Sequence, residues 1–132
     1  MKAFGKLFLL VFTSFVLVAC GSVYIKNVDV SQKPIVSNNP NQTLSLDQVR
    51  SAILQAGAKR GWVMKQEGTN KIIATQGTSY NVVVEIPFTE KSYSINYVSS
   101  TNFYERDGKI HRKYATWVGN LQRDIDEQLA TK

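Results

Sequence analysis

Few side chains in this sequence could do chemistry: one thiol, one imidazole and a scattered set of carboxylates. The thiol is Cys20 and the imidazole is His111. A thiol is a nucleophile or a site of modification, and an imidazole transfers protons or binds a metal. A lone histidine with no second thiol leaves only scattered carboxylates, such as Glu85 and Glu90, so we expect no metal and no cofactor. The sequence contains no Gly-x-Ser-x-Gly motif and places no acid partner beside His111, so we expect no enzyme activity.

The residues before Cys20 have the composition of an export signal. Lys2 and Lys6 give a positively charged start, and residues 7–18 form an almost unbroken apolar run. A membrane-spanning helix needs about 20 apolar residues, so this run is too short for an anchor and typical of a signal sequence. The alternative is a free or buried cysteine in an ordinary secreted protein. Exported domains normally use cysteines in pairs, and a single one suggests a free or modified thiol.

The four residues Leu17-Val18-Ala19-Cys20 resemble the bacterial lipoprotein signal, the lipobox, in which small residues precede a cysteine. This resemblance implies cleavage after Ala19 and a lipid-modified Cys20 as the first mature residue. Each buried CH₂ of an acyl chain contributes about 0.8 kcal/mol, and two lipid signals already give stable anchoring. Gly21, not Asp, follows the cysteine. Under the sorting pattern of proteobacterial lipoproteins this favours the outer membrane, with the domain on the periplasmic side.

We therefore divide the chain into three parts. Residues 1–19 are the expected signal peptide, residues 20–43 a lipidated N-terminus and flexible tether, and residues 44–132 one folded domain. Residues 37–43 are polar and rich in turn-forming residues. Apolar positions within residues 23–30 leave open that this segment docks on the domain.

The net charge of the chain limits the classes of partner that we expect. The formal net charge of +6 falls by two on cleavage, since Lys2 and Lys6 leave and no acid does. A mildly basic domain held at a membrane suits anionic headgroups or polysaccharide. Export separates the protein from nucleic acid, so we expect no nucleic-acid partner.

Two helices enclose the expected domain. Ser45 and Gln48 have the spacing of a capping box, and Gly61 can end a helix, which predicts a helix from Leu46 to about Lys59. The second helix is indicated by one continuous apolar stripe at helical spacing, formed by Tyr114, Trp117, Val118, Leu121, Ile125 and Leu129.

Four strands are expected between these helices, over residues 62–67, 71–76, 80–88 and 92–100. A turn at residues 89–92 would pair Phe88 with Tyr93, Ile86 with Ile95 and Val84 with Tyr97. Continuing the same meander backwards would pair Val82 with Ile73. The order predicts an α+β domain: a single four-stranded antiparallel meander with the N-terminal and C-terminal helices packed on one face.

Residues 45–129 resemble a family of small proteobacterial outer-membrane lipoproteins whose function is not established. The resemblance rests on residues 56–62 (AGAKRGW), 93–97 (YSINY), 100–104 (STNFY) and 110–121 (IHRKYATWVGNL). It implies the same fold and the same address, and it assigns no catalytic residue.

The loop before the last helix is the first place to look for binding. Asn102, Tyr104 and His111 combine an amide, an aromatic ring and an imidazole there, and loops on a rigid scaffold often carry function. Structural interpretations stand beside this one: Asp107-Gly108 is also a plain turn, and His111 could cap or pack at the start of the helix.

The back of the predicted sheet offers a partner surface. In the expected register Ile72, Val83 and Val98 line up across three strands, with Val63 nearby, among polar neighbours. An apolar strip on an open sheet face can mark an interaction site, although scattered surface valines are also normal.

These observations lead to one expectation and one alternative. We expect a non-enzymatic, lipid-anchored envelope lipoprotein that acts as a binding or assembly accessory for an envelope protein or polymer. The alternative is a small-ligand carrier with a cavity between helices and sheet, lined by Trp62, Tyr93, Tyr97 and Trp117. A carrier needs a cavity of several hundred Å³ among those rings.

Overall fold

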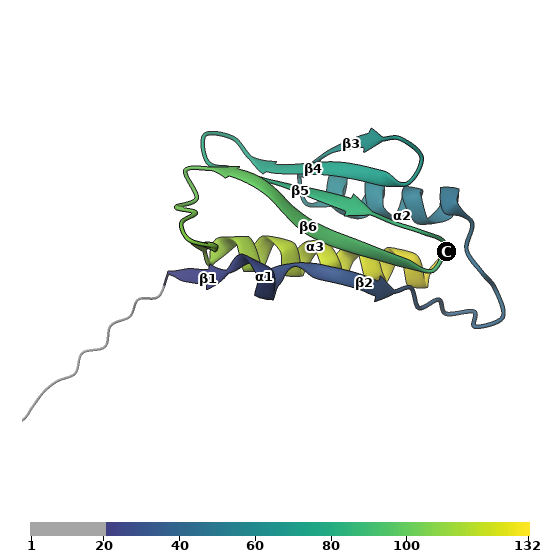
Figure 1. The fold of residues 1–132 in the computed structure, drawn as a ribbon. Helices are drawn as coiled ribbons and strands as arrows, with labels where there is room; N and C mark the ends of the chain where they lie inside the picture. Colours follow the sequence, from purple (N-terminus) through teal and green to yellow (C-terminus); the bar gives the residue numbers. More distant parts are fainter. Residues whose placement is uncertain (1–20) are drawn as a thin grey trace, which may run out of the picture.

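The computed structural model describes residues 21–132; the predicted signal sequence and the predicted lipidation site at Cys20 lie outside this range. Five strands form one antiparallel sheet in the order β2-β6-β5-β4-β3, and β1 pairs with β7 in a separate two-stranded sheet. Along the chain (Figure 1) the elements are β1 (Ser22–Tyr24), α1 (Ile25–Val28), β2 (Val30–Pro34), α2 (Leu46–Lys59), β3 (Val63–Glu67), β4 (Lys71–Gly77), β5 (Asn81–Pro87), β6 (Ser92–Thr101), β7 (Lys109–His111) and α3 (Lys113–Ala130).

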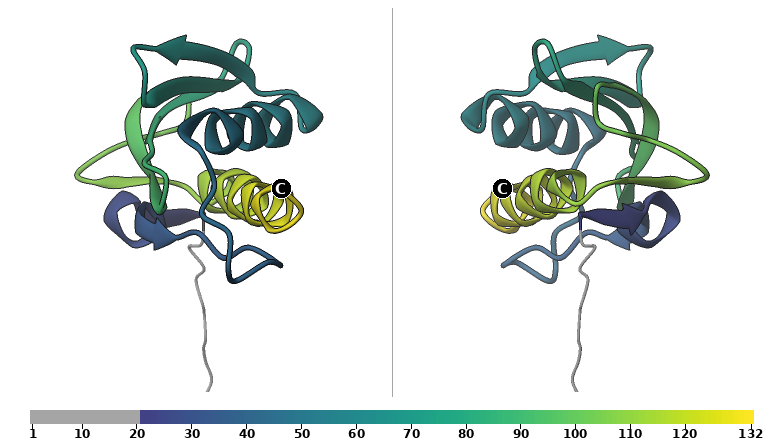
Figure 2. Two further views of the ribbon diagram at one scale, coloured as in Figure 1. Left: turned by 90° about the vertical axis from the view of Figure 1, so that its right-hand side faces the viewer. Right: turned by 90° about the vertical axis from the view of Figure 1, so that its left-hand side faces the viewer.

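The domain has two layers. Figure 2 shows the large sheet curving around α2 and α3, which lie side by side on its inner face. The apolar faces of the helices and of the sheet meet between the layers, as the layer architecture of an α+β fold requires. The largest fully buried side chains there include Tyr93, Tyr114, Phe88, Ile53, Ile72, Ile86 and Ile95.

Helix α2 has the ends that its sequence predicts. The Ser45 hydroxyl accepts from the Gln48 N–H at 3.1 Å, and the Gln48 side chain accepts from the Ser45 N–H at 2.9 Å. At the other end Gly61 has φ +84°, and the Trp62 N–H donates to the Gly57 carbonyl at 3.0 Å. These bonds satisfy backbone groups that every helix end leaves free. The capping box and the glycine stop are confirmed.

Helix α3 buries the predicted stripe against α2 and the sheet. Tyr114, Val118, Leu121, Ile125 and Leu129 are at most 1% exposed. Trp117 is only partly buried and packs against the edge of this core.

The N-terminal segment joins the fold, which corrects the predicted architecture. Strand β2 pairs with β6 and extends the sheet to five strands, and β1 pairs with β7. Two side chains fasten this segment: Asp29 accepts from the Tyr97 N–H and the Tyr114 hydroxyl, and Lys33 forms a 2.7 Å ion pair with Asp126. The α+β class is confirmed, whereas the single four-stranded meander is wrong. Residues 22–34 dock on the domain, and the loop of residues 35–45 leads to α2.

The β5–β6 hairpin has the predicted register near its turn, with Phe88 opposite Tyr93 and Val84 opposite Tyr97. Further along, Val83 faces Ser99, so Val98 is the extra residue of a β-bulge.

The predicted β4–β5 register is wrong by three residues. Gln76 lies opposite Val82, and Ile73 lies opposite Glu85. An odd shift turns a strand over, because successive side chains point to opposite faces. Ile72 is therefore on the inner face, opposite Ile86, and fully buried.

Candidate functional site

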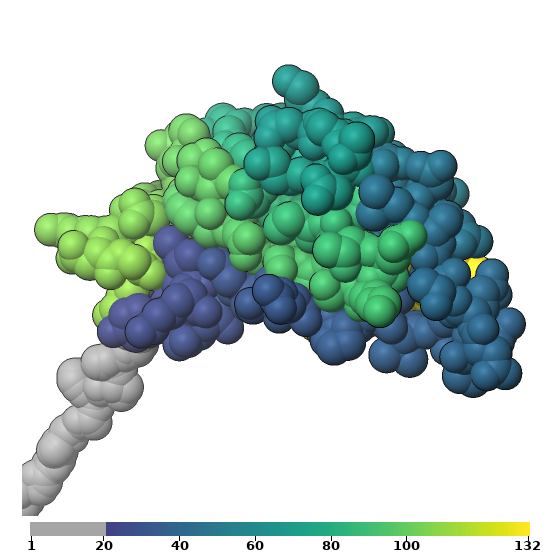
Figure 3. Space-filling model, turned by 45° about the vertical axis from the view of Figure 1, so that its right-hand side comes forward, coloured from purple at the N-terminus to yellow at the C-terminus, as the bar shows by residue number. Residues whose placement is uncertain are grey.

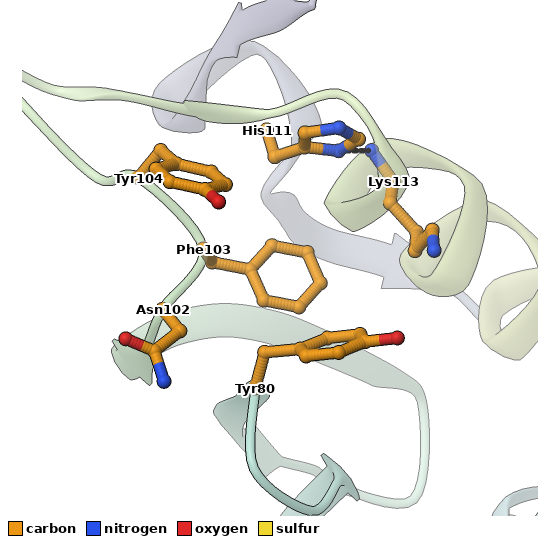
Figure 4. A pocket seen from close by; sticks show the side chains of 6 residues that line it. All are labelled: Tyr80, Asn102, Phe103, Tyr104, His111 and Lys113. Atoms are coloured by element: carbon orange, nitrogen blue, oxygen red, sulfur yellow. Dashed lines mark hydrogen bonds between the residues drawn. The ribbon is translucent and has the colours of Figure 1, made fainter.

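An open pocket lies at the end of the sheet where three parts of the chain meet. The β4–β5 turn, the loop after β6 and the junction of β7 with α3 surround a space of about 190 Å³ (Figure 4). The lining residues are Tyr80, Asn102, Phe103, Tyr104, His111 and Lys113. The structure thus brings together Asn102, Tyr104 and His111, the three residues that the sequence analysis selected.

Phe103 forms the floor of this pocket. Its side chain is 3% exposed, and its ring centroid lies 5.0 Å from that of Trp117, 6.1 Å from His111 and 6.2 Å from Tyr80. The Phe103 carbonyl also accepts from the His111 N–H at 3.0 Å. Aromatic rings at such separations stabilise one another beyond the area that they bury. Phe103 therefore ties the loop to the core and fixes the positions of its neighbours.

The backbone of the loop is held in uncommon conformations. Asn102 has φ +57° and Tyr104 has φ +58°. Asparagine tolerates this left-handed region, and its side-chain N–H donates to the Ser79 carbonyl at 2.8 Å, joining the loop to the β4–β5 turn. For an aromatic residue the same conformation is unusual, and Tyr104 adopts it with a side chain that is 81% exposed.

The predicted turn at Asp107-Gly108 is present. Both residues have positive φ, and Arg106 and Lys109 exchange backbone hydrogen bonds of 2.8 and 3.0 Å. This is the geometry of a two-residue hairpin turn. It projects the loop beyond the end of the sheet.

His111 caps the last helix. Its Nδ1 accepts from the Lys113 N–H at 3.0 Å, which satisfies one of the free donors at the start of α3. Arg112, the residue at the capping position, makes no such side-chain bond. The capping interpretation is confirmed. With Nδ1 occupied as an acceptor, the imidazole presents an Nε2–H donor to its surroundings.

The pocket has aromatic and cationic character. Lys113 Nζ lies 5.6 Å from the centre of the Tyr80 ring, a cation–π contact. Tyr104 and His111 face each other across the opening with ring centroids 6.4 Å apart. All six lining residues are aromatic, amide or basic. Such a lining can stack on a flat or apolar group and donate hydrogen bonds to an acceptor or an anion.

Three of these lining residues were not selected from the sequence. The sequence pattern assigns Tyr80 to the start of a strand. Phe103 and Lys113 occur only within the motifs of residues 100–104 and 110–121. Alternation with Val82 and Val84 places Tyr80 in that strand, whereas in the structure Tyr80 lies in the turn before β5 and is 51% exposed. Its pairing with Lys113 depends on the tertiary fold.

The four rings proposed for a carrier cavity are packing residues. Trp62 and Tyr93 are 4% and 1% exposed, and the rings of Tyr97 and Trp117 contact Tyr114 and Phe103. The Tyr93 hydroxyl donates to Asp126 at 2.6 Å. Burial, and then this carboxylate, raises the pKa of Tyr93 well above its usual range, which keeps the phenol protonated.

The outer face of the sheet carries part of the predicted partner surface. Val63 is 69% exposed, Val98 is 48% exposed, and Val83 is half-buried. Pairing places Val63, Thr75, Val83 and Ser99 in one line across four strands. Ile72 does not belong to this surface, because the corrected register puts it in the core.

The chain enters the domain beside the pocket. The Arg112 N–H donates to the Gly21 carbonyl at 2.8 Å, and Ser22 pairs with the pocket residue His111. Gly21, the first described residue, follows Cys20 directly in the sequence. A group attached to Cys20 would therefore stand next to this end of the fold.

Two further findings concern residues 21–132 alone. No helix in this part of the chain has both the length and the apolar character needed to cross a bilayer. No group of three or more potential metal-ligating side chains occurs within the same residues.

No family model, no curated protein and no solved structure matches this chain. The resemblance to small proteobacterial lipoproteins therefore stays a prediction.

Proposed function

We propose that this protein is a non-enzymatic envelope lipoprotein. A lipid on Cys20 holds the domain at the periplasmic side of the outer membrane, and the pocket of Asn102, Tyr104 and His111 binds a component of the envelope. Its role in this proposal is that of a binding or assembly accessory for an envelope protein or polymer.

The observation that carries the proposal is the position of the pocket. It opens at the end of the domain where the chain arrives from Cys20, because Ser22 pairs with His111. A short connection between anchor and domain holds such a pocket close to the membrane surface. The anchor then raises the effective concentration of the pocket near the components of the envelope.

The chemistry of the lining favours binding over catalysis. The His111 Nδ1 is committed to the start of α3, and the residues around the pocket include no carboxylate to orient or share a proton with the imidazole. General acid–base catalysis needs such a positioned pair or an equivalent group. Aromatic rings with an amide and an amine instead suit recognition.

Membrane fractionation of a Cys20→Ser variant tests the anchor. We expect the wild-type chain, and a Ser22→Ala control that keeps the thiol, to sediment with membranes as processed protein. The Cys20→Ser chain should be soluble or remain unprocessed. A Cys20→Ser chain that is processed and sediments like the wild type would contradict lipid anchoring.

A second candidate function uses the outer face of the sheet. Val63 and Val98 are large apolar side chains that the fold leaves in solvent, and neither lines the pocket. In this reading the strip of Val63, Val83 and Val98 contacts an envelope protein. Val98→Asp should then reduce crosslinked products in intact cells, whereas Thr69→Asp in the β3–β4 turn should not. Equal recovery of crosslinked products from both variants would exclude the strip as a contact surface for an envelope protein.

A further inference from the structure

The exposed tyrosines of this protein are gathered at one end. Three of its six tyrosines are largely buried or packed against the core; the other three, Tyr24, Tyr80 and Tyr104, are 47%, 51% and 81% exposed. Tyr80 and Tyr104 line the same pocket, and Tyr24 pairs with Lys109 in the adjacent two-stranded sheet. A tyrosine ring has an apolar body and a polar tip, which is the reason for its enrichment at membrane–water interfaces.

Cations accompany these rings. Lys109 Nζ lies 5.0 Å from the centre of the Tyr24 ring, and Lys113 Nζ lies 5.6 Å from that of Tyr80. Arg106 and Arg112 are exposed in the same segment. Within residues 21–132 none of these four cations forms an ion pair with a carboxylate. We define the anchor-end surface as the three exposed tyrosines together with these four cations.

The anchor-end surface surrounds the point where the chain enters the domain. Figure 3 shows the loop before β7 projecting from the body of the molecule, beside the first residues of the described chain. Gly21 is held there by its hydrogen bond from the Arg112 N–H. An anchor on Cys20 would thus bring this surface to the bilayer before any other part of the domain.

From this arrangement we infer that the anchor-end surface seats on the bilayer and contacts anionic phospholipid headgroups. The inference rests on the lipid anchor of the proposed function and adds an orientation to it. The tyrosine rings lie at the level of the headgroups, and the four cations meet lipid phosphates. Glu105 and Asp107 are the acids within residues 101–113, so this segment keeps an excess of positive charge.

The geometry of the pocket agrees with this partner. A volume of about 190 Å³ is small for a whole ligand, since ligand sites usually enclose about 300–1,000 Å³. For a phospholipid headgroup, only the phosphate group needs to enter the pocket. The Lys113 ammonium and the His111 Nε2–H are donors that suit phosphate oxygens.

Spin-label depth measurements test this orientation on the full-length lipidated chain in vesicles of phosphatidylethanolamine and phosphatidylglycerol. Cys20 is the only cysteine, so a lipidated chain accepts a nitroxide only at an introduced thiol. Thr78→Cys places the label in the β4–β5 turn of the anchor end, and Thr69→Cys places it in the β3–β4 turn as the matched control. We expect the nitroxide at position 78 to collide more often with oxygen, which concentrates in the bilayer, than with a water-soluble nickel complex. We expect the opposite ratio at position 69.

Variants with fewer positive charges distinguish contact of the anchor-end surface with the bilayer from attachment through the lipid anchor alone. Each basic residue near an anionic surface contributes about 1 kcal/mol, so Arg106→Gln with Arg112→Gln should lower the ratio of seated to unseated protein roughly thirtyfold. Lys65→Gln with Lys91→Gln, which alters exposed cations away from the anchor end, should leave the ratio unchanged.

The outcomes distinguish the two proposals. Equal exposure of positions 78 and 69 in a chain with a lipidated Cys20 would overturn the seating and leave the anchor standing. A second nitroxide on Cys20, together with failure to float with the vesicles, would overturn the anchor and the orientation that rests on it.

Discussion

Replacing Ile72 and Ile73 in turn by alanine tests the register of the central sheet. The two residues are neighbours in β4 and differ only in the face to which they point. Ile72 is fully buried opposite Ile86, whereas Ile73 is half-buried on the outer face, opposite Lys65 and Glu85.

The expected magnitudes follow from this difference. Ile72→Ala removes three buried carbons and leaves a cavity, which should lower the free energy of unfolding by about 2–5 kcal/mol. Ile73→Ala removes atoms that are partly in solvent already, so it should cost about 1 kcal/mol. A domain of this size has a total stability of about 5–15 kcal/mol, so the first change should lower the Tm by roughly 10–20 °C.

Urea denaturation followed by tryptophan fluorescence measures both variants, with Trp62 and Trp117 as probes. The slope of the transition should stay the same for wild type and variants, because the surface exposed on unfolding hardly changes. A larger loss for Ile73→Ala than for Ile72→Ala would refute the register and support the pairing of Ile73 with Val82.

Three other predictions concern helix α3. The Arg60 side chain lies 2.5 Å from the buried carboxylate of Asp124 and lowers the pKa of that carboxyl. The ionised Asp124 therefore stabilises the fold above the unfolded pKa of about 3.9, and this stabilisation is lost as the pH falls below that value. Asp124→Asn should therefore flatten the acid limb of a plot of urea midpoint against pH, and an unchanged limb would contradict the pairing. His111→Ala should cost about 1 kcal/mol, measured by urea denaturation, because the Lys113 N–H loses its cap; a wild-type midpoint would disprove the cap. Trp117→Ala should cost about 3 kcal/mol, because its half-buried ring packs on Phe103; an unchanged melting curve would show that this packing is unimportant.

Local chemistry predicted the helices well. The ends of α2 depend on Ser45, Gln48 and Gly61, which act on backbone groups only a few residues away. The apolar stripe of α3 likewise needs only the helical period. The tight β5–β6 hairpin was predicted for the same reason, since a short turn fixes the first pairs on either side of it.

The β4–β5 register could not be obtained in this way. Ile72 and Ile73 are adjacent and both apolar, so either can face the core and alternation does not choose between them. The choice is made by packing, because the observed register also buries Ala74 opposite Val84. The bulge at Val98 then shifts the later part of β6 by one residue relative to β5, which the sequence pattern of the two strands does not reveal.

The N-terminal strands were missed as parts of the sheet because their pairing is non-local. Strand β1 has three residues and pairs with a segment near residue 110, and β2 is interrupted by a bulge near Gln32, which has φ +44°. Neither has a clear alternating pattern. Their attachment depends on single contacts such as the bonds of Asp29 to Tyr97 and Tyr114.

The candidate site was found in part. The sequence predicts a binding loop from the amide, aromatic and imidazole side chains of Asn102, Tyr104 and His111. The fold places all three residues around one pocket. Tyr80 comes from a turn more than twenty residues earlier, and Phe103 gains its role from contacts with Trp117 and His111. Side chains brought together from separate elements leave no common pattern in the sequence.

Mass spectrometry of the mature protein, isolated from envelopes, examines the central claim most directly. Our account predicts an N-terminal peptide that begins at Cys20 and carries the added mass of acyl chains. A chain that still starts at Met1, or one with an unmodified thiol at Cys20, would contradict it.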